Sequence, residues 1–388
     1  MIDAVKRKRC YGCGVCVGAC PKSCISMKLD AQGFRYPICD AAACSHCGLC
    51  LKACPSHTPS QQPAFDTQAY ASLCRDQEIR RRSASGGLFY ALAQVIIENG
   101  GCVFGVVGNW LDKVHHTEAT TIDELIPMCR SKYLQSDVGA VYTQVKERLK
   151  QGREVLFSGT PCQVAALRNY LGYPHEKLFT IDLLCHGVPS ETVFHAHVME
   201  MEQRAQKKVI SVERKKAPYW TPTSYTYTYE DGTYEHVLTK GAMYNIGYLE
   251  NLFQRSACYH CAYAKIPRIG DITIGDYFGK RELYDTENLG LSVVVVNSHR
   301  GMELFSRIDN RVESHPIPLQ TAVIENAHLG HGPRYNILRP LFFRRFLRTG
   351  SYSTSARPFI TGWMSKTIRF SRKVKTKFKV MCKGARNK

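Results

Sequence analysis

The chain has 388 residues, 44% of them apolar, so it is too long for one ordinary domain and can bury substantial cores. Its net charge of +19 is uneven, because residues 339–388 contain fifteen Lys or Arg and no Asp or Glu. About +4 is left on the first 338 residues, so the body is nearly balanced and we do not expect nucleic acid as a partner.

Two cysteine runs near the N-terminus repeat with a period of 34 residues. Each has the spacing Cys-x2-Cys-x2-Cys-x3-Cys-Pro, which is typical of bacterial ferredoxins with two [4Fe-4S] clusters. In such proteins the last cysteine of each run binds the other cluster. We therefore predict one cluster on Cys10, Cys13, Cys16 and Cys54, and a second on Cys44, Cys47, Cys50 and Cys20.

Zinc sites and disulfides are the competing interpretations of these runs. Zinc sites usually pair two Cys-x2-Cys motifs and need neither the third cysteine nor the Cys-Pro. Residues 1–7 lack the apolar core of a signal peptide, so we expect a cytoplasmic protein, in which disulfides are rare. Cys24 and Cys39 lie off the ligand spacing, and we expect them to be small core residues rather than ligands.

The remaining pattern predicts an α/β body after a short linker. Residues 25–27 and 34–38 are predicted strands of the cysteine-rich domain, and the polar, proline-rich residues 56–63 are a predicted linker. Helices are then predicted at 88–99, 138–152, 163–171, 190–204 and 301–308, and strands at 103–107, 154–157, 178–184, 271–275 and 292–296. Residues 224–229 run into Asp231-Gly232, which predicts a β-hairpin.

We therefore expect an α+β ferredoxin-like dicluster domain followed by an α/β body with a mixed sheet and a basic C-terminal tail. The predicted regions are 1–60 for the dicluster domain, 65–206 and 207–338 for the two parts of the body, and 339–388 for the tail.

One turn of the body is a candidate phosphate site. The small residues Ser83 to Gly87 lead directly into the helix predicted from Leu88, and a helix N-terminus with such residues can bind an anion through backbone N–H groups. Ordinary helix capping is the alternative. A flavin would suit a chain that carries one-electron clusters, because a flavin also handles electrons in pairs.

Four further cysteines could hold a third cluster. Cys162 and Cys185 each follow a predicted strand and would face the crevice at the carboxyl ends of the sheet, while Cys258 and Cys261 form a close pair. The position of Cys162 near a helix N-terminus would lower its pKa and favour the thiolate. Buried core thiols are the alternative that local spacing leaves open.

Six motifs of the body occur in an informative order. They are RSASGG at 82–87, SKYLQS at 131–136, GTPCQ at 159–163, CHG at 185–187, CYHC at 258–261 and DITIGD at 271–276. Together they resemble the β subunit family of coenzyme F420-reducing hydrogenases and dehydrogenases over about residues 65–330. The resemblance implies an FAD-containing iron–sulfur oxidoreductase that exchanges electrons with a hydride carrier or another organic partner. Members with a fused ferredoxin domain are often found among genes for cell-surface polysaccharides, which suggests a role in their synthesis.

The resemblance also implies roles for individual residues. FAD contacts are implied for Ser83, Ser85, Gly86, Gly87, Lys132, Tyr133, Gln135, Ser136, Gly159 and Thr160. A third [4Fe-4S] cluster on Cys162, Cys185, Cys258 and Cys261 becomes favoured, while a flavin contact or a catalytic role for Cys162 stays open. His186 and Asp276 are candidate catalytic proton partners, with a structural histidine and a capping aspartate as the alternatives.

Three functions therefore stay open at this stage. The chain could be an FAD-dependent iron–sulfur oxidoreductase, an electron-transfer adaptor that supplies a separate enzyme, or a redox sensor or scaffold with structural clusters. The first two need a redox partner protein, such as a ferredoxin or a reductase.

The last segment of the chain suggests a membrane surface. Trp363, Phe370, Val374, Phe378 and Met381 recur at helical spacing among basic residues. Such a helix could insert its aromatic side chains into an anionic membrane surface, and a solvated terminus is the alternative. No apolar run approaches the ~18 residues that would span a bilayer, so we expect at most peripheral attachment at the inner face of the membrane.

Overall fold

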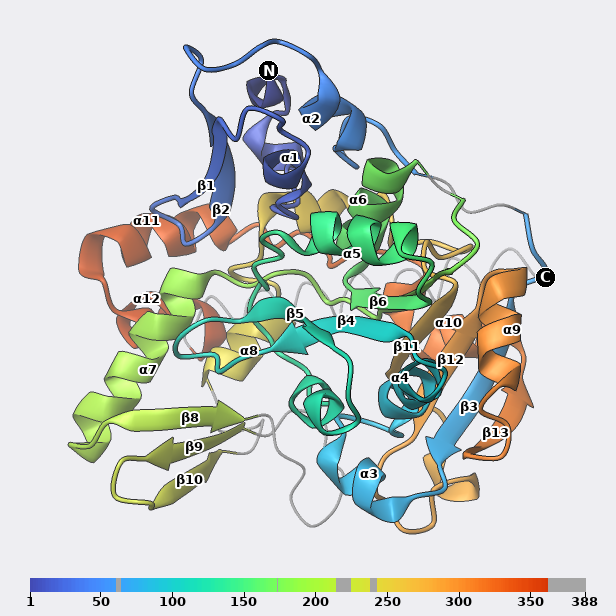
Figure 1. Ribbon diagram of the computed structural model, residues 1–388. Coiled ribbons are helices and arrows are strands. Elements are labelled where there is room, and N and C mark those ends of the chain that lie inside the picture. Colours follow the sequence, from blue (N-terminus) through green and yellow to red (C-terminus); the bar gives the residue numbers. More distant parts are fainter. Residues whose placement is uncertain (61–63, 173, 214–224, 238–242, 362–388) are drawn as a thin grey trace, which may run out of the picture.

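The computed structural model describes residues 1–60, 64–172, 174–213, 225–237 and 243–361, and a mixed eight-stranded sheet forms the centre of the body (Figure 1). The strand order is β13-β3-β12-β11-β7-β6-β4-β5. The bounds are β3 Gln68–Cys74, β4 Cys102–Val107, β5 His115–Ala119, β6 Val155–Gly159, β7 Leu178–Leu183, β11 Ile272–Asp276, β12 Ser292–Val296 and β13 Val312–Ile317. The neighbouring strands β11, β7, β6 and β4 are parallel, and the outer pairs are antiparallel. The predicted α/β body with a mixed sheet is confirmed, and both predicted body regions supply strands to it.

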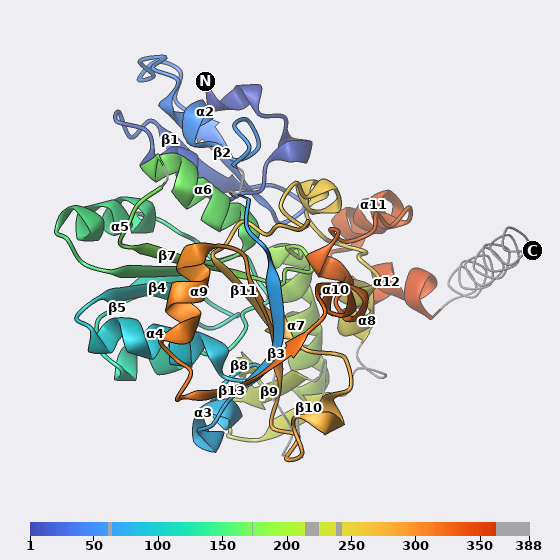
Figure 2. The ribbon, with the colours of Figure 1, turned by 90° about the vertical axis from the view of Figure 1, so that its right-hand side faces the viewer.

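Helices cover both faces of this sheet (Figure 2). On one face lie α4 Leu88–Glu98 and α9 His299–Ser306, and on the other lie α5 Val141–Lys150 and α6 Pro161–Leu171. Val103 of β4 belongs to the core on the α4 side, whereas the next residue, Phe104, belongs to the core on the α5 side. Because both faces are covered, the parallel strands are continuous apolar runs, which is why they could be predicted.

The cysteine-rich domain is built from two matching halves around a hairpin. β1 Ile25–Leu29 and β2 Arg35–Cys39 lie where strands are predicted, and they pair antiparallel. The short helices α1 Val15–Gly18 and α2 Leu49–Ala53 each follow a glycine in the left-handed region, Gly14 with φ 76° and Gly48 with φ 75°. The 34-residue repeat of the sequence therefore corresponds to a repeat of the backbone, with glycine where a left-handed turn is needed.

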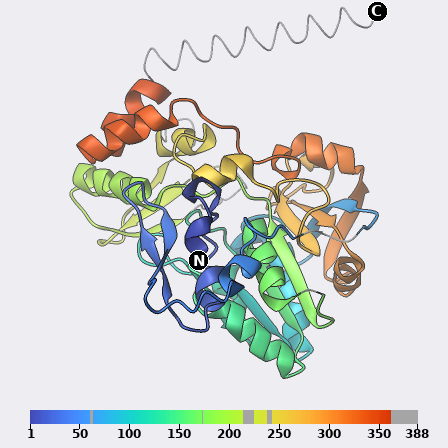
Figure 3. The same cartoon turned by 90° about the horizontal axis from the view of Figure 1, so that it is seen from above.

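A buried arginine docks this domain on the body. Arg255 has 0% exposure, and its Nη1 donates to Cys10 O at 3.1 Å while its Nη2 donates to Arg35 O at 2.8 Å and to Gln135 Oε1 at 3.0 Å. Gln135 Nε2 in turn donates to Tyr11 O at 2.8 Å and to Gly12 O at 3.0 Å. The first cysteine loop is thus held by the body through its main chain, above α5 and α6 (Figures 1 and 3).

Aromatic residues form a second core beside the main sheet. The small antiparallel sheet of β8 Val209–Glu213, β9 Tyr225–Tyr229 and β10 Tyr234–Val237 contains the predicted hairpin. It packs with α7 Glu191–Ala205, α8 Met243–Leu249, α11 Arg339–Thr349 and α12 Tyr352–Ile360. The remaining α-helices of the described residues are α3 Gln77–Arg82 and α10 Leu319–Glu325.

The predicted tail is wrong in its first part. Residues up to 361 belong to the fold, because α11 buries Phe342, Phe343 and Phe346 and α12 buries Tyr352. Of the α11 arginines, Arg344 and Arg348 are exposed, and the buried Arg339 donates hydrogen bonds to Gln254 O and Gln32 Oε1. The positions that suggested a membrane-surface helix, from Trp363 to Met381, lie outside the described residues. Within the described part of the chain, no helix is both long enough and apolar enough to cross a bilayer.

Adjacent residues of α11 test whether this helix is structural. Phe342 has 0% exposure and Leu341 has 48%. We expect Phe342→Ala to lower the free energy of unfolding by about 3–5 kcal/mol, because it leaves a cavity in the aromatic core. Leu341→Ala should change it by less than about 0.5 kcal/mol. Denaturant unfolding of both variants measures the difference, and equal effects would mean that α11 is not part of the core.

The buried arginine gives a second prediction. Arg255→Met leaves the carbonyls of Cys10 and Arg35 without their donor, and about 1–3 kcal/mol is expected for each unsatisfied group. We therefore expect a loss of about 3 kcal/mol and a faster release of iron from the cysteine-rich domain to a chelator. Arg344→Met changes an exposed arginine of α11 and serves as the control. Iron release at the rate of the unchanged protein would contradict the docking role of Arg255.

Candidate functional site

The first predicted cluster set is assembled. Cys10, Cys13, Cys16 and Cys54 line one cavity, which brings the last cysteine of the second run to the first run, as the interleaved pattern predicts. Burial raises the pKa of Cys54, and nearby thiols raise it further. Burial disfavours the thiolate form of these thiols unless a metal neutralises its charge, so the residues fit a cluster.

The second predicted set is arranged differently. Cys47 is exposed, and Cys44 and Cys50 are half-buried. Cys20 Sγ lies 3.3 Å from Cys24 Sγ. Cys44 lies with Cys24 and Cys39, and these three sulfur atoms are within 4.8 Å of one another. Cys24 and Cys39, predicted to be core residues, are half-buried, and their thiols lie together with that of Cys44.

The third predicted set comes together from three separate places in the chain. Cys162 begins α6, Cys185 follows β7, and Cys258 and Cys261 lie in and just after the 3-10 helix Ser256–His260. The pKa of each of the four thiols is raised, with burial as the largest cause. The N–H of Gly187 donates to Cys185 Sγ and that of Val188 to Cys258 Sγ, both at 3.4 Å. Such backbone donors toward sulfur fit a cluster, and ligation by these four stays a prediction.

The expected electrostatics of Cys162 need a correction. Its place at the start of α6 predicts a lowered pKa, but burial raises that pKa well above its ordinary value, and the Cys261 thiol adds to the effect. The positive end of the helix does not offset the loss of water around the sulfur. Without a metal Cys162 is therefore a neutral thiol, which argues against a free nucleophilic thiolate.

The third set lies between the first set and a large pocket. Cys13 is close enough to Cys162 to raise its pKa, and Cys185 lines the pocket. Tyr11, in the first cysteine loop, accepts a hydrogen bond on its hydroxyl from Ala262 N–H at 3.2 Å, next to Cys261. Tyr142 donates to Cys13 O at 3.0 Å and so fixes the same loop from α5.

The pocket opens at the carboxyl ends of the four parallel strands and encloses about 1380 Å³ of space, part of which is open to solvent. Val106, Gly159, Leu183 and Asp276, at or near those ends, all line it. This is the crevice in which open α/β sheets bind ligands. Its lining extends from the start of α4 past the start of α6 to α8.

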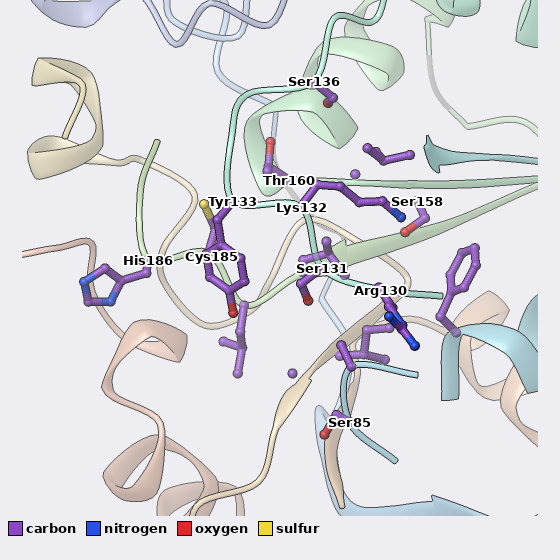
Figure 4. A pocket seen from close by; sticks show the side chains of 18 of the residues that line it. Ser85, Arg130, Ser131, Lys132, Tyr133, Ser136, Ser158, Thr160, Cys185 and His186 are labelled. Carbon is purple, nitrogen blue, oxygen red and sulfur yellow. The ribbon is translucent and has the colours of Figure 1, made fainter. Parts of the chain in front are cut away.

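Most residues predicted to contact FAD line this pocket (Figure 4). They are Ser83, Ser85, Gly87, Lys132, Tyr133, Gln135, Ser136, Gly159 and Thr160. Gly86 is outside the lining. Its N–H donates to Ser292 Oγ at 2.9 Å, and a Cβ there would lie 2.5 Å from Ser72 O, so Gly86 serves close packing against β3. The prediction of a flavin contact at Gly86 is thus not supported by its position.

Two of these residues use their side chains for structure. The amide of Gln135 bridges the cysteine loop and Arg255, as described above. Ser136 Oγ accepts from Gln163 Nε2 at 3.0 Å, and Gln163 Oε1 accepts from Thr160 N and Thr160 Oγ1, both at 2.9 Å. This capping box fixes the start of α6 against the pocket wall.

The features of the pocket near α4 fit a phosphate. Gly87 precedes this helix with φ 86° and offers no side-chain cap, and Leu88 and Phe89 of the first turn line the pocket. The buried Ser83 hydroxyl lies beside the Cys129 thiol and makes no hydrogen bond to an oxygen or nitrogen of the described residues. Both features would suit phosphate oxygens, so the residues present fit a flavin dinucleotide.

The cationic side chains around the pocket have different partners. The buried Arg80 forms ion pairs with the buried Asp285 and with Glu287, whose side chain is 43% exposed, and so does not face a ligand. The lining cations are Arg130, which sequence reasoning missed, and Lys132. Burial lowers the pKa of Lys132 to about 8, and the charge of Arg130 contributes.

The two candidate proton partners have different positions. Asp276 ends β11 at the pocket. The His186 backbone lines the pocket, but its ring points away from the other labelled side chains in Figure 4 and contacts the rings of His328 and Tyr248, with centroids at 4.4 and 4.9 Å. Burial, followed by the charge of His328, lowers the pKa of His186 to about 4. His186 is thus neutral near pH 7, which argues against the proton-transfer role expected for it.

Comparisons with known proteins agree with this architecture. Residues 152–319 match the family model for the C terminus of the coenzyme F420 hydrogenase/dehydrogenase beta subunit, and residues 9–58 match that of a 4Fe-4S dicluster domain. A similar solved structure is a chain of the F420-reducing [NiFe] hydrogenase complex from Methanosarcina barkeri, at 20% identity and a TM-score of 0.48, covering 66% of this chain and 85% of that one. No match is found among curated proteins. The resemblance predicted from the sequence is confirmed over these two ranges: the chain joins a region that matches 4Fe-4S dicluster domains to a region that matches the C terminus of the coenzyme F420 hydrogenase/dehydrogenase beta subunit.

Proposed function

We propose that the chain is an iron–sulfur flavoprotein oxidoreductase that passes electrons between the clusters and FAD and so reduces or oxidises an organic substrate or hydride carrier. One observation carries this proposal. Cys162 of the third set lies near enough to Cys13 of the first set and to Cys185, which lines the pocket, for both thiols to raise its pKa. Such proximity is what transfer of single electrons from one end to the other requires.

The proposal gives each part of the pocket a task. The N-terminus of α4, Ser83, Arg130 and Lys132 would hold the phosphates, while Tyr133 and the backbone of Gly159 and Thr160 would form the wall around the rest of FAD. FAD, when bound, exchanges electrons singly with iron–sulfur clusters and as hydride with an organic partner. Asp276, at the end of β11, is the residue of the chain best placed to hold or accept a proton there.

The pocket favours a substrate-handling oxidoreductase over a simple adaptor. An adaptor needs no crevice, whereas this one extends along the ends of the parallel strands and opens to solvent, where a second molecule could approach a bound dinucleotide. A redox partner protein would meet the chain at its exposed second thiol set, where Cys47 reaches the surface. A role in surface-polysaccharide synthesis and attachment to an anionic membrane surface stay predictions from the sequence.

Metal and flavin content test the proposal directly. Anaerobically purified protein should contain about twelve irons and one FAD per chain if all three sets hold [4Fe-4S] clusters. Cys162→Ser should remove about four irons, keep FAD bound, and slow flavin reduction by a chemically reduced ferredoxin by at least about tenfold. Cys74→Ser, which changes a buried thiol of β3, is the matched control. Eight irons without flavin would favour a bare electron carrier and contradict the proposal.

The pKa of Lys132 predicts how flavin binding depends on pH. Lys132 is charged below about pH 8 and neutral above it, so the affinity for the anionic FAD should fall as the pH rises through this value. Lys132→Arg should keep tight binding without the fall, because arginine stays charged, and Lys132→Met should bind weakly at every pH. Flavin dissociation constants between about pH 6.5 and about pH 9.5 provide the measurement. A parallel pH dependence in Lys132→Met would assign the effect to another group.

A further inference from the structure

Two cysteines outside the cluster spacing lie side by side at the open end of the hairpin. Cys24 directly precedes β1, and Cys39 ends β2, where it pairs with Ile25. The N–H of Asp40 donates to Cys24 O at 2.8 Å, which holds the two strand ends together. Cys24 and Cys39 are thereby fixed side by side by the sheet, with their sulfur atoms 3.9 Å apart.

A turn brings the third thiol to this pair. The carboxylate of Asp40 accepts a hydrogen bond from Ala42 N–H at 3.0 Å, and this turn leads the chain back toward the hairpin. The sulfur atoms of Cys24, Cys39 and Cys44 then lie within 4.8 Å of one another. Cys20 Sγ, 3.3 Å from Cys24 Sγ, is the nearest candidate for a fourth ligand. All four thiols are half-buried, so an ion can reach them.

The spacing of the Cys24 and Cys39 sulfur atoms fits a single tetrahedral ion, whereas Cys20, which lies outside the group of three, has to shift to become the fourth ligand. Zinc–sulfur bonds of about 2.3 Å at tetrahedral angles place ligand sulfurs about 3.8 Å apart. The 3.9 Å between Cys24 and Cys39 is close to this value. A cubane instead holds its thiolates at four separate corner irons, which spreads them farther apart than one ion does.

We propose that Cys24, Cys39 and Cys44, with Cys20 as the fourth ligand, form a mononuclear site for a soft divalent ion of the zinc class. Binding releases the thiol protons to solvent as the metal–sulfur bonds form, and no electron is exchanged. The site shares Cys20 and Cys44 with the second cluster of the proposed function. Only the predicted competition between the ion and that cluster rests on the proposed function; the ion site itself does not. One ion and the second cluster therefore exclude each other, and the ion would disconnect the exposed end of the thiol path.

A background that lacks only the second cluster isolates this site. Cys47→Ser/Cys50→Ser removes two ligands of the second cluster and leaves all four thiols of the proposed site. The full chain is loaded anaerobically with iron and sulfide, so that the other sets are filled, and then titrated with Co²⁺. We expect one Co²⁺ per chain with the absorbance of tetrahedral cobalt thiolate. Adding Cys24→Ser/Cys39→Ser should weaken this binding by at least about a hundredfold.

Matched controls separate loss of the site from loss of the fold. Cys74→Ser/Cys102→Ser, added to the same background, changes two buried thiols of the body and should leave Co²⁺ binding unchanged. The remaining iron content and the melting temperature should agree among the loaded variants. Three results would each overturn the proposal. Co²⁺ binding could survive Cys24→Ser/Cys39→Ser, the background could show no tight Co²⁺ site, or Cys47→Ser/Cys50→Ser could leave the iron content unchanged.

Competition in the otherwise unchanged chain gives an independent measurement. Zn²⁺ added before iron and sulfide should lower the final iron content by about four per chain, and Cys24→Ser/Cys39→Ser should restore it. Equal iron with and without Zn²⁺ would contradict the competition. These readouts do not involve flavin or the third thiol set, so their failure is distinguishable from failure of the proposed oxidoreductase function.

Discussion

A buried guanidinium is central to the docking of the first cysteine loop on the body, together with the Gln135 amide and the Tyr142 hydroxyl. Arg255 is fully buried, and a buried cation is tolerated only where acceptors surround it. Its acceptors are the carbonyls of Cys10 and Arg35 and the amide of Gln135, and its guanidinium carbon lies 4.7 Å from the ring centroid of Tyr36. Most of these partners belong to the cysteine-rich domain. The domain and the body therefore stabilise each other, which fixes the distance between the first thiol set and the rest.

The parallel part of the sheet determines what this loop is docked against. Parallel strands present their carboxyl ends at one edge, so residues distant in sequence meet there. Cys162 follows β6 and Cys185 follows β7, while Asp276 ends the neighbouring β11. Gln135 lines the pocket and also holds the cysteine loop with its amide, so one residue contacts both regions. For this reason Cys185 of the third thiol set and Gln135 both belong to the wall of the pocket.

Elements with strong apolar patterns can be predicted from the sequence, and those without cannot. β4, β6, β7 and β12 are buried on both faces and form apolar runs. β5 and β13 escape prediction because they are the edge strands of the sheet, where polar residues and Pro316 are tolerated. α11 falls inside the predicted tail because its arginines hide the apolar stripe that it buries.

The same division applies to the site. The gathering of Cys162 and Cys185 follows from strand topology, which the sequence predicts. The role of Arg130 and the turned ring of His186 depend on packing between distant segments, which leaves no local pattern. Burial also decides charge, which the sequence does not show. Cys162 is predicted to be a thiolate, yet the surrounding protein pushes Cys162, Cys185 and Lys132 toward their neutral forms. A positive metal centre or an anionic phosphate restores the charged forms, so the site acquires its chemistry only together with the groups that it binds.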